Sequence, residues 1–160
     1  MPTRAAVYEA GADLEPFQVL AGEHALLRLQ LTRALDAARA NPLGSTARRA
    51  LAALYDGFRL HQRREDLVLV PACERLFGGR DGAASVLRDE HAAIRRAFTA
   101  ALAKPVGLGS LSVPALHELH GLLEAHFVRE ERVLFPMMTA HLARREAADL
   151  ARRLRATRLA

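Results

Sequence analysis

The stretch 61-HQRREDLVLVP-71 decides the fold, because the chain repeats it as 126-HFVREERVLFP-136. The two stretches are identical at six of eleven positions, including the histidine, the glutamate four residues after it and the closing proline. Residues four apart lie on one face of an α-helix, with Cβ atoms about 6 Å apart. Each stretch therefore predicts a helix that presents one imidazole and one carboxylate to the same neighbours.

A shorter repeat lies upstream of each stretch, as 23-EHALLR-28 and 90-EHAAIR-95. The upstream copies are 67 residues apart and the downstream copies 65, so the two halves of the chain are related helix pairs. Breakers at 41–44, 78–79 and 104–113 separate the helices. We expect four long helices and a short basic fifth one. They lie at about Pro16–Ala40, Thr46–Phe77 with Ser45 as N-cap, Gly82–Ala103, 113–141 after Ser112 with Pro114 in the first turn, and 143–158.

Short connections between long helices favour antiparallel neighbours. The sequence thus predicts an all-α, up-down-up-down four-helix bundle with a short C-terminal helix. We interpret residues 1–160 as a single domain with its core at about 15–141. Pro71 and Pro136 fall inside expected helices and should bend or restart them.

Each expected helix carries an apolar stripe at three- and four-residue spacing, and polar residues interrupt each stripe near its middle. A buried carboxylate or imidazole is costly unless it is paired, protonated or bound to metal. The four apolar stripes face one core, so the polar residues that interrupt them should lie close together. A single metal centre would account for all of them. The candidate ligands are His24, His61, Glu65, His91, His126 and Glu130.

Other polar residues of the expected helix that carries His126 and Glu130 lie off its apolar stripe. His120 and Glu124 repeat the His-x-x-x-Glu spacing, but they lie about 120° around the helix from His126 and Glu130. We assign both, with His117, to the outer face. His141 is placed as a cation at the helix end.

Composition limits the function. Cys73 is the only cysteine, so no intramolecular disulfide forms and a reducing compartment is expected. The first sixteen residues lack the apolar run of a signal peptide, and no run of eighteen apolar residues occurs. We therefore predict a cytoplasmic protein without a membrane partner. The net charge of +5 comes from arginines interleaved with acids, and no aromatic stacking set accompanies them, which argues against nucleic-acid binding.

At these residues the chain resembles the hemerythrin family, in particular its His-His-Glu cation-binding domains, over about residues 15–141. The resemblance implies two non-haem iron ions about 3.5–4 Å apart, bridged by carboxylates and by an oxo or hydroxo group. It assigns His24 and His61 to one iron, His91 and His126 to the other, and Glu65 and Glu130 to both.

The chain departs from the oxygen-carrying hemerythrins at two positions. Those proteins place a further histidine where this chain has Arg95, and they end on an aspartate one residue after the position of Glu130. The resemblance therefore implies binding of, or reaction with, O2, peroxide or nitric oxide, for sensing, peroxide removal or iron and oxygen handling, and does not favour carriage. A ferritin-like di-metal oxidase and a metal-free interaction module are the alternatives, and zinc or manganese could replace iron. Arg28, the counterpart of Arg95, has two interpretations: a snorkelling side chain or a contact near the cluster.

Overall fold

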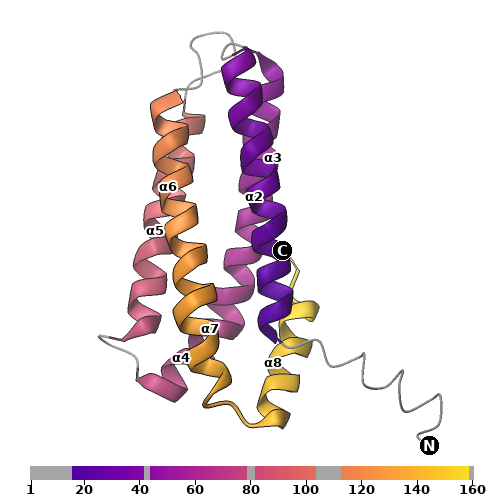
Figure 1. The fold of residues 1–160 in the computed structure, drawn as a ribbon, viewed down its shortest axis with the longest axis vertical. Helices are drawn as coiled ribbons and strands as arrows, with labels where there is room; N and C mark the ends of the chain where they lie inside the picture. Colours follow the sequence, from indigo (N-terminus) through magenta and orange to yellow (C-terminus); the bar gives the residue numbers. More distant parts are fainter. Residues whose placement is uncertain (1–15, 42–43, 79–81, 104–112, 159–160) are drawn as a thin grey trace, which may run out of the picture.

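The computed structural model describes residues 16–41, 44–78, 82–103 and 113–158, and within these ranges the chain is helical without strands. Four long helical arms stand side by side and a shorter helix packs near one end (Figure 1). The elements are α2 (Pro16–Ala40), α3 (Ser45–Arg64), η1 (Glu65–Leu69), α4 (Val70–Phe77), α5 (Ala83–Leu102), α6 (Val113–Arg129), η2 (Glu130–Leu134), α7 (Phe135–Thr139) and α8 (Arg144–Ala156).

The predicted all-α four-helix bundle is confirmed. Sequence neighbours pack together as α2 with α3 and α5 with α6, and the two pairs meet where α2 contacts α6 and α3 contacts α5. Several helix boundaries differ slightly from expectation. In particular, α3 begins at Ser45, so Gly44 and not Ser45 takes the cap position, without a side-chain hydrogen bond. Residues 104–112, within the expected breaker segment, lie outside the described residues.

The second and fourth arms each contain a π-helical turn, named η1 and η2, at equivalent positions of the repeat. In both turns the first residue is the candidate ligand glutamate, and the N–H of Val70 or Phe135 donates to its carbonyl five residues back. The α-helix resumes immediately after each turn, with Pro71 or Pro136 in its first turn. The expected restart at each proline is therefore present, because a residue without an N–H is tolerated at the start of a helix.

Two apolar layers fill the bundle, one on each side of the histidine level. The first layer includes Leu31, Leu51, Phe58, Ile94, Phe98, Leu119 and Phe127. The second includes Phe17, Leu20, Val68, Leu69, Cys73, Leu87, Leu134, Phe135 and Met138, together with Leu150 and Leu154 of α8. The buried histidines and glutamates thus lie between two apolar layers, which hold them in place and limit the access of water.

The C-terminal helix α8 packs against α2 and η1. The guanidinium of Arg153 donates to the carbonyl oxygen of Leu67, at 3.4 Å. That carbonyl would accept the N–H of residue 71 in a regular α-helix, and proline has none. In the described part of the chain, no helix combines the length and apolar character needed to cross a membrane.

Candidate metal centre

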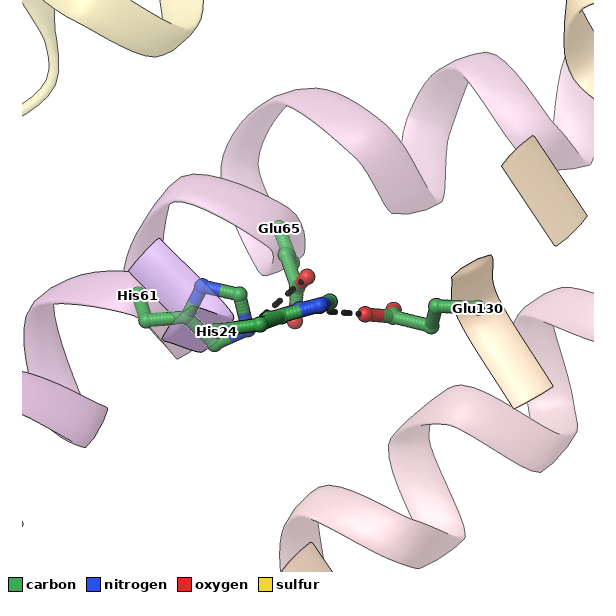
Figure 2. Close-up of side chains that lie close together, drawn as sticks. All are labelled: His24, His61, Glu65 and Glu130. Carbon is green, nitrogen blue, oxygen red and sulfur yellow. Dashed lines mark ion pairs between the residues drawn. The ribbon is translucent and has the colours of Figure 1, made fainter. Parts of the chain in front are cut away.

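Six side chains from four helical arms converge at the middle of the bundle. His24 comes from α2, His91 from α5, and each His-x-x-x-Glu pair spans the junction between an α-helix and its π-turn. All six are buried, with at most 1% of their surface exposed. Figure 2 shows four of them, His24, His61, Glu65 and Glu130, facing one another.

The inner nitrogens and the carboxylate oxygens lie within a few ångströms of each other. His24 Nε2 is 3.1 Å from Glu130 Oε2, and His61 Nε2 is 3.1 Å from Glu65 Oε1. His91 Nε2 lies 3.0 Å from Glu65 Oε2, while His126 Nε2 lies 3.6 Å from the same oxygen. Two ligands that each lie about 2.1 Å from one metal ion, at right angles, are about 3 Å apart. The spacing of these atoms is that of ligands around metal ions.

The outer nitrogen of each histidine faces its own carboxylate. His24 Nδ1 lies 2.8 Å from Glu131 Oε1, and the other pairs are His61 with Glu23 at 2.9 Å, His91 with Asp66 at 2.8 Å and His126 with Glu90 at 3.1 Å. A carboxylate accepts a hydrogen bond, so each Nδ1 is placed to carry a proton, and with a metal bound each Nε2 would present its lone pair to the centre. Outer carboxylates fix metal-binding histidines in this way.

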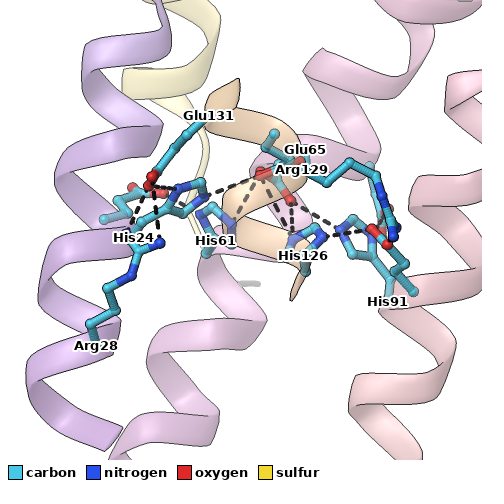
Figure 3. A network of polar contacts seen from close by, with 12 residues as sticks. His24, Arg28, His61, Glu65, His91, His126, Arg129 and Glu131 are labelled. Carbon is cyan, nitrogen blue, oxygen red and sulfur yellow. Dashed lines mark hydrogen bonds and ion pairs between the residues drawn. The ribbon is translucent and has the colours of Figure 1, made fainter. Parts of the chain in front are cut away.

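Three of the four outer carboxylates are held by arginines. Figure 3 shows one of them, Glu131, facing both His24 and Arg28. Arg28 donates from Nη1 to Glu131 at 2.8 Å and from Nε to Glu124 at 2.9 Å. The guanidinium of Arg28 also lies over the ring of Phe127, 5.2 Å from its centroid. Of the two interpretations of Arg28, these contacts support the one that places its side chain near the metal cluster.

The other arginines occupy equivalent positions of the repeat. Arg64 pairs with Glu23, and Arg129 pairs with Glu90. The fourth carboxylate, Asp66, instead accepts a hydrogen bond from the Gln62 amide at 2.8 Å. The groups that hold the outer carboxylates therefore follow the repeat, except that Asp66 is held by an amide and not by an arginine.

Burial and charge set the protonation of the centre. Burial, together with the smaller effect of the neighbouring His61, lowers the pKa of His24 to about 3, so His24 is neutral near pH 7. Burial raises the pKa of Glu130 well above its ordinary value, and the charge of Glu65 adds to this effect. Burial alone would also raise the pKa of Glu65, but the surrounding histidines, His61 first, hold it well below the ordinary value. A cation bound here would replace the proton on Glu130.

Several inner atoms have no hydrogen-bond partner within the described residues. They are His24 Nε2, His61 Nε2, His126 Nε2, Glu65 Oε1, and both carboxylate oxygens of Glu130. Buried polar atoms are normally satisfied, and a group of unsatisfied ones facing the same space calls for a bound ion. The donor set, neutral imidazole and carboxylate, is one that suits a transition-metal ion. The residues present thus fit a metal.

The inner atoms form two groups that could each hold an ion. One contains His24, His61, Glu65 and Glu130, and the other contains Glu65, His91 and His126, with the ligand atoms of each group within 4.8 Å of one another. The structure therefore brings all six predicted residues together. Glu65 belongs to both groups.

The polar residues that were assigned to the outer face do not join these groups. His117 and His120 are exposed, and the Glu124 carboxylate turns to Arg28 instead. His141 is exposed, with its Nδ1 hydrogen-bonded to the Met137 carbonyl at 2.8 Å. Arg95 lines a surface cavity of about 270 Å³ that reaches His91.

The four outer carboxylates are functional residues that the sequence analysis did not single out. The sequence carried a signal for them. Glu23 precedes His24 of α2, and Glu90 precedes His91 of α5. Asp66 and Glu131 follow the ligand glutamates directly. Each position is acidic in both halves of the repeat. Repeated acidic positions next to the ligands, on elements facing other histidines, would have identified them.

Fold and site together define a cation-binding helical bundle whose site is built from two related halves. The profile described as "Hemerythrin HHE cation binding domain" matches residues 15–108 and 85–158. The chain belongs to this hemerythrin family of HHE cation-binding domains. No curated protein and no solved structure matches the chain significantly.

Proposed function

We propose that the protein is a non-haem di-iron protein whose centre binds or reacts with O2, peroxide or nitric oxide. The observation that carries this proposal is the set of buried inner atoms without hydrogen-bond partners among the described residues, arranged in two groups that share Glu65. Membership of a cation-binding family supports it. The lone, buried Cys73 supports a reducing, cytoplasmic location.

In this proposal His24 and His61 would hold one iron, His91 and His126 would hold the other, and Glu65 and Glu130 would supply carboxylates to both. Bound iron would supply a redox-active Lewis acid that polarises a small oxygen- or nitrogen-containing ligand. The chain's own residues orient the ligands, since each outer carboxylate keeps one imidazole in the Nδ1–H tautomer. The apolar layers on both sides keep bulk water away from the site.

Within this set of ligands, sensing or reaction is favoured over reversible O2 carriage. Arg95, one helical turn after His91, supplies no imidazole, so an iron held by His91 and His126 would lack a third histidine. Both irons would then have the same number of histidines. Two equivalent irons would not direct O2 to a single position, which reversible carriage would need.

Two alternatives fit the geometry less well. Ferritin-like di-metal oxidases use carboxylate-rich sites with glutamate three residues before histidine. Here glutamate follows histidine by four, and four imidazoles accompany two carboxylates. A metal-free interaction module would leave the buried Nε2 atoms unsatisfied, which is costly.

The test is anaerobic reconstitution with ferrous iron, followed by nitric oxide or by hydrogen peroxide, with the optical spectrum recorded throughout. We expect new absorption with nitric oxide and conversion to a ferric spectrum with peroxide. Glu65→Ala should abolish both changes. Glu124→Ala, which alters a carboxylate outside the two groups, should retain them. A reconstituted protein with an unchanged spectrum under both treatments would contradict the proposal.

A further inference from the structure

The two related halves of the bundle differ in how their outer groove is covered. In the first half, α8 lies on the groove between α2 and η1, and its side chains Leu150, Ala151 and Leu154 are buried there with the apolar layer. Figure 1 shows α8 on the side of the bundle opposite α5. The equivalent groove of the second half lies between α5 and the η2–α7 segment.

Exposure at equivalent positions shows that none of the described elements covers this second groove. Val68, under α8, is 3% exposed, whereas its counterpart Val133 is 57% exposed. The side chain of Arg64 is 15% exposed and that of its counterpart Arg129 is 47% exposed. The same apolar surface is therefore filled by a helix in one half and left accessible in the other.

The open groove is a cavity of about 420 Å³, which is within the range of small-molecule sites. Its lining is polar at one end and apolar at the other. Arg129 and Glu130 lie at the level of the metal centre, and Met137 lies two helical turns further, about 10 Å along the arm. Val86 and Val133 line the space between.

The hydrogen-bond donor at the polar end is the guanidinium of Arg129, whose side chain is 47% exposed. The carboxylate of Glu130 is turned inward, 3.1 Å from His24 Nε2, so it does not face the groove as a free anion. Arg129 pairs with Glu90, with Nη1 as the closest nitrogen, and a guanidinium has five N–H donors, as Arg28 shows by holding two carboxylates. The remaining donors of Arg129 can bind an anionic group.

We propose that this groove binds a medium-chain aliphatic carboxylate, with its head at Arg129 and its chain along Val86, Val133 and Met137. The first half shows which chemistry fills such a groove, because leucine and alanine side chains of α8 occupy the equivalent space. An alkyl chain buries the same kind of surface, and the arginine supplies a charge-assisted hydrogen bond to the head. The site needs no metal, so its failure would leave the di-iron proposal untouched.

The experiment titrates decanoate, below its micellar concentration, into the full-length reconstituted protein by calorimetry. We expect saturable binding of one molecule per chain. Decanol, which has the same chain without the charge, should bind at least about tenfold more weakly. Decanoate binding should also weaken as salt is raised.

The matched variants are Val133→Glu in the groove and Leu26→Glu on α2, both at exposed positions where folding tolerates a charge. We expect Val133→Glu to lose at least about tenfold in decanoate affinity and Leu26→Glu to leave it unchanged. Equal weakening in both variants, equal affinity for decanol, or no saturable binding would overturn the proposal. Sedimentation of the wild type as a dimer that Val133→Glu dissociates would assign the groove to a second copy and overturn it as well.

Discussion

Replacement of Glu131 by alanine tests whether the outer carboxylates tune the metal site. The change removes the acceptor 2.8 Å from His24 Nδ1 and leaves that N–H buried without its partner. Loss of such an outer partner typically costs about 10- to 100-fold in metal affinity, or about 1.4 to 2.7 kcal/mol. We expect Glu131→Ala to bind iron more weakly by this factor, measured by competition with a chelator of known affinity.

The control is Glu124→Ala. Glu124 holds the same arginine, at 2.9 Å from Arg28 Nε, but contacts no histidine of the centre. Its removal should leave iron affinity within about twofold of the wild type. Glu131→Gln, which keeps an acceptor oxygen but loses the charge, should fall between the two. If Glu131→Ala and Glu124→Ala bind iron equally well, the outer carboxylate does not tune the site and the reasoning is refuted.

Three further results are expected. Because the pKa of His24 is lowered to about 3, the unfolded chain takes up a proton at this residue that the folded metal-free protein excludes. The raised pKa of Glu130 opposes this effect above about pH 4.5, so stability should fall by at least roughly 1.4 kcal/mol per pH unit from about pH 4.5 toward pH 3 in denaturant titrations; a flat profile in that range would contradict this. Phe58→Ala removes a fully buried ring beside His61, His91 and His126 and should cost about 3 to 5 kcal/mol, seen as a melting temperature lower by about 10 °C; an unchanged melting temperature would count against this packing. Arg95→His places an imidazole one turn from His91 and should lengthen the lifetime of the oxygenated spectrum in stopped-flow measurements, whereas an identical decay would show that residue 95 does not reach the centre.

The repeat in the sequence predicted the four-helix bundle and the convergence of six polar residues, because both follow from helical spacing. Residues four apart must share a helix face, and four apolar stripes must meet in one core. The positions of Pro71 and Pro136 also predicted where the arms change their winding. They did not predict a π-turn, since a proline in a helix is compatible with several local geometries.

Helical spacing alone could not predict which outer carboxylate faces which histidine. Glu131 follows a ligand glutamate by one residue, which in a regular α-helix turns its side chain about 100° away. Its partner His24 lies on a different helix, and only the packing of α2 against the fourth arm brings the two together. Helix α8 was expected as a short basic helix. Its packing against only one of the two equivalent grooves depends on tertiary contacts, which the sequence pattern does not specify.

The number of metal ions per chain tests the central claim most directly. The wild-type protein, reconstituted with ferrous iron under anaerobic conditions and freed of excess metal, is analysed for iron and for protein by independent methods. Two groups of ligand atoms that share Glu65 predict two iron ions per chain. A value of one, or only trace iron, would contradict the account.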